Sequence, residues 1–314
     1  MIQFFARRFI FILFILFFVS LAVFVITEIL PGDAAAMILG QRATPESLAA
    51  LRVRLGLDQP APERYLSWIG NLLRGEWGES LVMHLPVGPL LAQRLRNSAV
   101  LALLALTFST VLGMGLGIVA GLNRNRWPDR LSSLIVVFFV GFPSFVVAIF
   151  LIILFSFWLH WLPASSMIEA DANLFSSLRF LILPTLTLTL GGMAEVARLT
   201  RSSLIDVLQR DYIRTATSKG LPRSTIVIRH ALRNTLLPTV SVVALNVGYL
   251  ISGTVLVESV FAFPGLGRLL LQAIEQRDLP LLQGAALAAA GIYALANLVA
   301  DIAYFWINPR VRYT

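Results

Sequence analysis

The stretch DYIRTATSKGLPRSTIVIRHALRNTLLP, from Asp211 to Pro238, is a basic segment between two strongly apolar ones. Between Arg198 and Arg233 the chain carries eight Lys or Arg residues and only two acidic residues, Asp206 and Asp211. Such a segment is too charged to lie in lipid, and an excess of basic residues keeps a loop on the cytoplasmic side of a membrane. The chain is therefore expected to cross a membrane repeatedly, with this segment at the cytoplasmic face.

Two short helices separated by a turn are predicted within this segment. Apolar residues at helical spacing predict a first helix over Ile205 to Ser218, and a second is predicted over Arg223 to Asn234. Gly220, Leu221 and Pro222 lie between them, and glycine readily takes the left-handed conformation after a helix, while proline suits the first turn of the next. The expected result is a stiff, protruding knuckle. The alternative is a solvated loop that only sets topology and touches lipid phosphates.

Composition agrees with a membrane protein. Hydrophobic residues make up 57% of the 314 residues, charged residues 13%, and the mean hydropathy is +0.80, which excludes a soluble chain of this length. Since about 20 apolar residues cross a bilayer as a helix, six spans are predicted in an all-α polytopic fold. They are Phe9 to Thr27, Ser98 to Leu122, Leu131 to Trp158, Phe180 to Ala197, Leu236 to Val257, and Pro280 to Ala300.

The distribution of basic residues orients these spans. With both termini in the cytoplasm, 15 of the 25 Lys and Arg residues fall in inner segments, and the outer segments hold equal numbers of basic and acidic residues. Because the Lys and Arg excess orients short loops, the high isoelectric point indicates topology and not nucleic-acid binding. The first span is too long for the apolar core of a removable signal peptide, typically about 7 to 15 residues.

The region from Pro31 to Asn97 is the one large polar excursion, on the outer side. Thr44 and Pro45 predict a helix start, and a second amphipathic helix is predicted over Ala61 to Arg74. These helices are expected on the outer membrane surface or as a cap on the transmembrane bundle. Docking of a soluble partner is the alternative.

Several residues within the spans have both a packing and a functional interpretation. The four-residue spacing of Gly113, Gly117 and Gly121 favours close helix packing. Gly141 and Pro143 interrupt the third span, as packing geometry or as a gating joint. Glu258 is expected at the outer interface rather than as a functional acid inside the membrane. Small and weakly polar residues of the fifth span either pack helices together or line a wet passage. The candidate translocation path combines four of them with the interruption of the third span and comprises Gly141, Pro143, Asn246, Gly248, Ser252 and Gly253.

Catalytic and metal sites have no support in the sequence. The predicted topology puts His84 and His160 outside and His230 inside, and the chain has no cysteine. Lys219, the only lysine, is not preceded by the glycines of a phosphate-binding loop. Neither a catalytic residue, a metal nor a cofactor is expected in this chain, and any ATP-driven activity requires a separate ATPase.

An ordered series of motifs resembles the permeases of binding-protein-dependent ABC importers, in the dipeptide, oligopeptide and nickel branch. The general coupling-loop pattern is Glu-Ala-Ala, three residues, then Gly; Arg214, Thr215 and Ala216 occupy the first three positions and Gly220 the last, so only Ala216 and Gly220 match. The other motifs are LPGD (30–33), RLGLDQP (54–60), RNRWPDR (124–130), VESVFAFPGLGRLLLQAI (257–274) and INPRVRY (307–313).

The resemblance implies the type I ABC importer permease fold in a bacterial inner membrane. A second related permease, two ATPase subunits that carry ATP and Mg, and an outer substrate-binding protein are the implied partners. The implied domains are an N-terminal span (1–30), an external excursion (31–97), a five-helix core (98–307) with a coupling loop (198–235), and a cytoplasmic tail (308–314). The implied ATPase-coupling residues are Arg214, Thr215, Ala216, Gly220, Leu221, Arg223, Ile226, Arg229 and His230.

The resemblance implies ATP-driven import by alternating access. Di- or oligopeptides are the first expected cargo, and glutathione or a nickel complex is the alternative. A channel would need no coupling knuckle. An ion-driven secondary transporter would normally place ionisable groups at mid-membrane, whereas the acidic residues of the predicted spans lie near helix ends.

Overall fold

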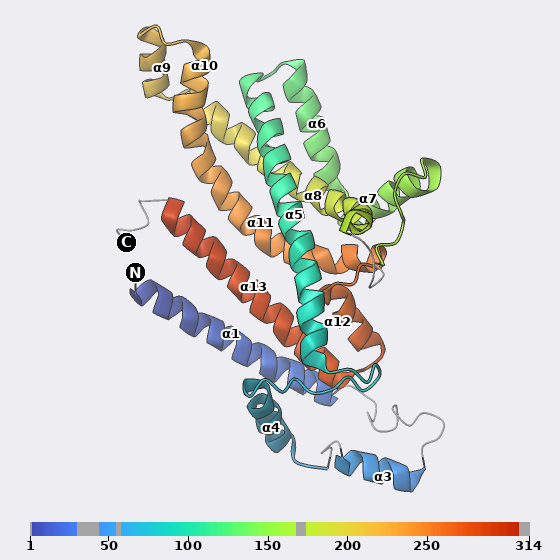
Figure 1. The fold of residues 1–314 in the computed structure, drawn as a ribbon. Coiled ribbons are helices and arrows are strands. Elements are labelled where there is room, and N and C mark those ends of the chain that lie inside the picture. The colour runs from blue at the N-terminus through green and yellow to red at the C-terminus, as the bar shows by residue number, and fades with distance from the viewer. Residues whose placement is uncertain (1, 30–43, 55–57, 168–173, 308–314) are drawn as a thin grey trace. The chain divides into compact units, whose positions relative to one another are not determined.

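The computed structural model describes residues 2–29, 44–54, 58–167 and 174–307, which form a succession of helices (Figure 1). Within these ranges the only extended pairing is an isolated bridge between Glu79 and Pro86. The all-α class is confirmed. The helices are α1 (Ile2–Ile29), α3 (Pro45–Arg54), α4 (Ala61–Leu73), α5 (Val87–Leu122), α6 (Trp127–Gly141), α7 (Ser144–Leu151), the π-helical segment η2 (Ile152–Trp158), α8 (Leu174–Leu208), α9 (Asp211–Ser218), α10 (Arg223–Thr225), the π-helical segment η3 (Ile226–Leu232), α11 (Arg233–Val260), α12 (Leu266–Glu275) and α13 (Leu279–Ile307).

Contacts divide the chain into two compact units. Unit 1 comprises Met1–Asn97 and Gly265–Leu295, and unit 2 comprises Ser98–Pro264 and Ala296–Thr314. The division into domains predicted from the sequence, with boundaries after residues 30, 97 and 307, stays a prediction.

Unit 1 has its core where the start of α5 meets α12 and the start of α13. Val87, Leu269 and Leu281 are buried there. Asp278 is also buried; its carboxylate accepts hydrogen bonds from the Ser80 hydroxyl (2.5 Å) and from the Leu281 N–H (3.3 Å). The acid therefore caps the first turn of α13 and ties the loop before α5 to it.

Helix α4 packs on α1 within the same unit. The rings of Phe24 and Tyr65 lie 5.3 Å apart, the Tyr65 and Ser20 hydroxyls are 2.9 Å apart, and Arg64 forms an ion pair with Glu28. The amphipathic helix predicted over Ala61 to Arg74 is thus confirmed, and it covers the end of the first span.

The predicted start of α3 is confirmed as well. Thr44 Oγ1 accepts from the Ser47 N–H at 3.2 Å, and Ser47 Oγ accepts from the Thr44 N–H at 2.9 Å. This reciprocal pair satisfies two backbone donors that the first helical turn leaves without a partner.

In unit 2, α5 and α8 pack at close range through glycines. A Cβ atom on Gly113 would lie 2.7 Å from the Met193 carbonyl oxygen, and one on Gly117 would lie 2.6 Å from that of Ala197. Gly121 faces Leu204 in the same way, with a Cβ atom 2.9 Å from Leu204 Cδ2. The packing interpretation of the glycine spacing is confirmed.

The third predicted span is broken where the sequence indicated. Helix α6 ends at Gly141, α7 begins at Ser144 after Pro143, and the two are bent by 107°. Proline at position 143 cannot donate a backbone hydrogen bond, and its ring disfavours a helical conformation for the preceding Phe142, which is extended.

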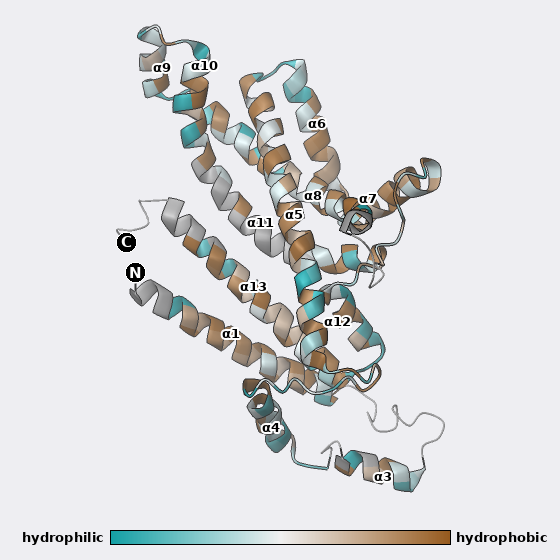
Figure 2. Ribbon diagram, in the orientation of Figure 1, coloured by the Kyte–Doolittle hydropathy of each residue, from teal (hydrophilic) through white to brown (hydrophobic). Residues whose placement is uncertain are grey.

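By length and composition, four helices of the described residues can cross a membrane: α1, α5, α8 and α13. The bent α6–α7 pair makes a fifth if it is one span. The remaining predicted span, Leu236 to Val257, falls within the 28 residues of α11. Figure 2 shows how hydrophobic residues predominate along α1 and α6.

The expected place of Glu258 at the outer membrane interface stays a prediction, but the structure shows what surrounds its side chain. It is fully buried in unit 2, at the last turn of α11, and accepts a hydrogen bond from the Ser98 hydroxyl at 2.5 Å. A buried carboxylate needs such donors because burial removes its hydration. Protein atoms of unit 2 therefore surround this acid.

Candidate functional site

The basic segment forms a compact hairpin of helices, which we call the basic knuckle and define as residues 209–232. Helix α8 stops at Leu208, and α9 begins two residues beyond the turn at Gln209. The Arg210 carbonyl accepts from the N–H groups of Ile213 (3.0 Å) and Arg214 (3.3 Å), which starts α9. The helix predicted over Ile205 to Ser218 is thus two helices.

Gly220 makes the turn of the basic knuckle. Its φ is +76°, and its N–H donates to the Thr217 carbonyl at 2.9 Å. The Leu221 N–H donates to the Ala216 carbonyl at 3.3 Å, so the end of α9 has the hydrogen bonds of a glycine-terminated helix. The left-handed glycine inferred from the sequence is confirmed.

A small apolar core holds the two arms of the basic knuckle together. Ile213 and Ala216 of α9 are buried against Ile226 and Ala231 of the second arm and against Leu204 of α8. The knuckle is therefore fastened to the end of α8 by burial of apolar surface, which a slack loop would lack.

The second arm differs from the predicted short helix over Arg223 to Asn234. Three residues of α10 lead into the π-helical segment η3, which continues directly into α11. Helical conformation therefore continues without a turn from Arg223 through η3 into the apolar run of α11. The tyrosine of α9 strengthens the join, because the Asn234 amide donates to the Tyr212 hydroxyl at 3.0 Å.

The candidate coupling residues fall into two groups. Ala216 and Ile226 are buried in the core of the basic knuckle and His230 is half-buried, so these residues shape it from within. The exposed members are Arg214, Thr215, Gly220, Leu221, Arg223 and Arg229. Figure 1 shows α9 and α10 together beyond the ends of α8 and α11, where this exposed face is accessible in unit 2.

The exposed face combines positive charge with apolar area. Arg214 lies 3.7 Å from Asp211 in a fully exposed pair of little energetic value. Among the described residues, no acidic side chain lies within ion-pair distance of Arg223 or Arg229. Ile228 is 67% exposed and Tyr212 42%, so the face is not uniformly polar.

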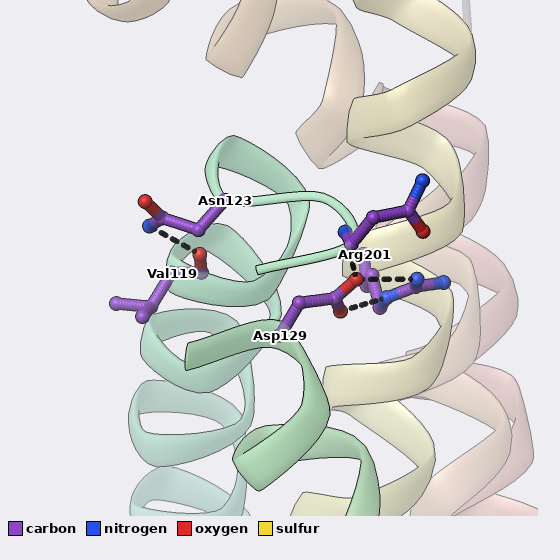
Figure 3. Close-up of polar contacts among 5 residues, drawn as sticks. Val119, Asn123, Asp129 and Arg201 are labelled. Carbon is purple, nitrogen blue, oxygen red and sulfur yellow. Dashed lines mark hydrogen bonds and ion pairs between the residues drawn. The ribbon is translucent and has the colours of Figure 1, made fainter. Parts of the chain in front are cut away.

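An ion pair close to the basic knuckle was not anticipated from the sequence. Arg201 of α8 donates from Nε to Asp129 Oδ1 (2.5 Å) and from Nη2 to Asp129 Oδ2 (2.9 Å), as Figure 3 shows. The Asn125 N–H donates to the same carboxylate at 2.8 Å, and Asp129 is 3% exposed. The signal in the sequence was that Asp129 is the one acid of a short segment that also holds Arg124, Arg126 and Arg130.

The Glu195 and Arg198 side chains form the expected i,i+3 pair on α8, at 3.8 Å, and both are exposed. This pair lies one turn from Arg201 along the same helix. It differs from the Asp129–Arg201 pair because it joins nothing beyond α8.

The candidate translocation residues are only partly described. Gly141 and Pro143 are exposed at the break between α6 and α7, and a Cβ atom on Gly141 would meet nothing within 4 Å. Gly253 of α11 faces Leu188 of α8, with a Cβ atom 3.5 Å from Leu188 Cδ2. Asn246, Gly248 and Ser252 fall within the bounds of α11, but their surroundings lie outside the described part of the structure.

Within the described ranges, no three His, Cys, Asp or Glu side chains gather as metal ligands would. His84 and His160 lie in loops with positive φ, and His230 belongs to η3. The described features that are candidates for function include the exposed basic face, the Asp129–Arg201 ion pair and the break at Gly141.

Two family models match the chain. Residues 113–313 match the family described as "Binding-protein-dependent transport system inner membrane component". Residues 1–113 match "Binding-prot-dependent transport system membrane comp, N-term".

Curated relatives match over nearly the whole length. The chain is 42% identical over 298 residues to the glutathione transport system permease protein GsiC of Shigella flexneri serotype 5b, with 95% of each chain covered. It is 41% identical, with the same coverage, to GsiC of Escherichia coli. Among solved structures, a crystal structure of an amino acid ABC transporter with histidines has a TM-score of 0.52 at 16% identity, covering 71% of this chain and 94% of the other. That likeness supports the fold.

Proposed function

The chain belongs to the family of binding-protein-dependent transport system inner membrane components, and we propose that its cargo is glutathione or a peptide of similar size and charge. It is a permease subunit of an ABC importer of the peptide and nickel branch, with the type I permease fold. The sequence put di- and oligopeptides first and glutathione among the alternatives. The names of the relatives favour the glutathione alternative, and glutathione is itself a tripeptide.

The basic knuckle carries the proposal for how the chain uses ATP. It has its own apolar core, which includes Leu204 of α8, an exposed basic and apolar face, and a second arm that continues directly into α11. A partner ATPase that moves this face would move α8 and α11 with it. The exposed residues Arg214, Thr215, Leu221, Arg223 and Arg229 contact the ATPase, while Ala216, Ile226, His230 and Gly220 keep the shape that it recognises.

The partners and cofactors follow from this assignment. A second related permease completes the passage, two ATPase subunits bind ATP and Mg, and a substrate-binding protein delivers the cargo from outside. The exposed Lys219 follows α9 in a tight turn and has no glycine-rich sequence before it, so this chain supplies no phosphate-binding loop of its own.

The membrane orientation has both termini in the cytoplasm. The support is the excess of Lys and Arg in the segments that then lie inside, the basic knuckle among them. The break at Gly141 and Pro143 and the small residues Asn246, Gly248, Ser252 and Gly253 of α11 line the passage that opens alternately to the two sides.

Uptake by the complete complex tests the assignment. The chain is co-expressed with its partner permease, ATPases and binding protein, purified, and placed in vesicles that contain ATP. We expect ATP-dependent accumulation of labelled glutathione and competition by unlabelled glutathione. Accumulation of a dipeptide or a nickel complex, with none of glutathione, would replace the cargo assignment and leave the importer function in place.

A further inference from the structure

The Asp129–Arg201 ion pair joins two elements that the apolar core of the basic knuckle does not join. Asp129 lies in the first turn of α6, and Arg201 lies on α8, two turns before that helix ends at Leu208. Both oxygens of the carboxylate are engaged by Arg201, and the Asn125 N–H adds a third donor. Asn125 itself has a φ of +63°, so the loop between α5 and α6 is shaped around the carboxylate.

Helix α5 contacts the same turn of α8. A Cβ atom on Gly117 would lie 2.6 Å from the Ala197 carbonyl and 3.1 Å from the Arg201 backbone nitrogen. The hairpin of α5 and α6 therefore contacts α8 by close backbone packing from α5 and by a two-point ion pair from α6, beside the apolar packing of Val136 of α6 on Ala194 and Ala197. Charge-assisted, two-point contacts fix relative orientation more strictly than single hydrogen bonds do.

This turn of α8 leads directly into the basic knuckle. Leu204, one turn beyond Arg201, is fully buried against Ile213 and Ala216, and Gly121 of α5 packs on it. At its other end α6 stops at Gly141, where the bend to α7 begins. A rigid connection at Asp129 thus links the basic knuckle to the break between α6 and α7.

From this geometry we infer that Asp129 and Arg201 are positioning residues for ATP coupling: they make α6 move as one body with α8 and the basic knuckle. The inference rests on the proposed function, because it states which helices move when the ATPase moves the basic knuckle. Without the pair, α6 would still pack on α8 through Val136, Ala194 and Ala197, but its orientation on α8 would be less strictly fixed, and the break at Gly141 would not open in step with the basic knuckle.

Transport per ATP in the reconstituted complex is the first test. Replacing Arg201 alone leaves the buried Asp129 carboxylate without its ion-pair partner and destabilises the fold, so the informative variant is the double one, Asp129→Asn with Arg201→Gln. We expect wild-type membrane abundance, subunit assembly and basal ATP hydrolysis, with uptake per ATP reduced within the range of about 5- to 150-fold that coupling between sites usually spans. A merely structural pair would leave uptake per ATP unchanged once the double variant is assembled.

The exposed pair on the same helix provides a matched control. Glu195→Gln with Arg198→Gln removes the same charges one turn away and should leave uptake per ATP at the wild-type level. An equal loss in both double variants would mean that α8 tolerates no loss of charge, which contradicts a specific role for Asp129 and Arg201.

A distance measurement tests the same idea without depending on the variants. In this cysteine-free chain, Arg126→Cys and Gln209→Cys place spin labels on exposed positions beside α6 and at the end of α8. The distance between the labels should stay constant between the ATP-free and ATP-bound complex. A change of the distance with ATP would overturn the inference even while the wild-type complex imports glutathione, and a wild-type complex without ATP-dependent uptake would instead overturn the proposed function.

Discussion

Replacing Gly220 should impair coupling to the ATPase without affecting insertion of the chain into the membrane. Gly220 has a φ of +76°, and a Cβ atom there would meet nothing within 4 Å, so the cost of a side chain comes from the backbone alone. A left-handed conformation costs an ordinary residue roughly 1 to 2 kcal/mol. For Gly220→Val we expect normal membrane abundance, weaker attachment of the ATPase or loss of its stimulation, and lost uptake, measured on purified membranes.

The matched control at this position is Gly220→Asn, because asparagine visits the left-handed region more readily than valine. The asparagine side chain is similar in volume to that of valine, but the Gly220→Asn protein should keep most of the wild-type uptake. Wild-type uptake and ATPase stimulation in Gly220→Val would mean that the basic knuckle is only a topology-setting loop.

Gly117 and Gly115 form a second pair of test positions, on the same helix. A Cβ atom on Gly117 would lie 2.6 Å from the Ala197 carbonyl oxygen, whereas one on Gly115 would meet nothing within 4 Å. Gly117→Ala should therefore destabilise the packing of α5 on α8 by about 1 to 3 kcal/mol, the usual cost of overpacking. Gly115→Ala should leave the thermal unfolding midpoint of the detergent-purified protein unchanged or higher, and a similar loss in both variants would contradict the role of the close approach.

Two isoleucines of η3, both in the second arm of the basic knuckle, have different surroundings. Ile226 is buried in the core of the knuckle, whereas Ile228 is 67% exposed on η3. Ile226→Ala should cost about 2 to 5 kcal/mol of local stability and should speed amide hydrogen exchange in α9. Ile228→Ala should leave exchange unchanged and weaken ATPase attachment instead, as measured by co-purification; accelerated exchange in this variant would place Ile228 in the core.

The sequence was most informative where a single residue type determines the local structure. Gly220, the Thr44 start of α3 and the Gly141 to Pro143 break were all predicted, because backbone conformation at glycine, proline and helix-capping residues depends on neighbours in sequence. The spacing of Gly113, Gly117 and Gly121 also predicted close packing, although not that α8 is the partner.

Other features depend on residues far apart in the chain. Asp129 and Arg201 are 72 residues apart, and their pairing requires the α5–α6 hairpin to lie against α8. Glu258 follows a long uncharged run, which suggested an interface, but its hydrogen bond to Ser98 joins residues 160 positions apart in the chain and could not be predicted from the local sequence. The π-helical segment η3 has apolar and basic residues like those of an ordinary helix, so its register and its continuation into α11 could not be inferred from periodicity.

For the whole chain, the distribution of Lys and Arg predicts which segments lie on each side of the membrane. Single cysteines at positions 7, 126, 219 and 312 should react only from the cytoplasmic side, and those at 63, 169 and 276 only from outside. The natural absence of cysteine means that each variant has a single reactive thiol. Impermeant maleimide applied to intact cells and to inverted vesicles distinguishes the two sides, and labelling of position 219 from outside would contradict both the topology and the coupling role of the basic knuckle.

The chain should transport nothing in response to ATP without an ATPase subunit. Lys219, its only lysine, follows the exposed helix α9 and lacks the preceding glycines that cradle phosphates, whereas the basic knuckle has a packed interior and a basic outer face suited to a partner. Vesicles containing this chain, the second permease and the binding protein should show no ATP-dependent uptake of glutathione, and addition of the ATPase subunits should restore it. Complexes that carry Asp129→Asn with Arg201→Gln should bind those subunits as the wild type does, because the pair lies outside the basic knuckle. ATP-dependent uptake in the absence of any ATPase subunit would refute the division of labour between this chain and its partners.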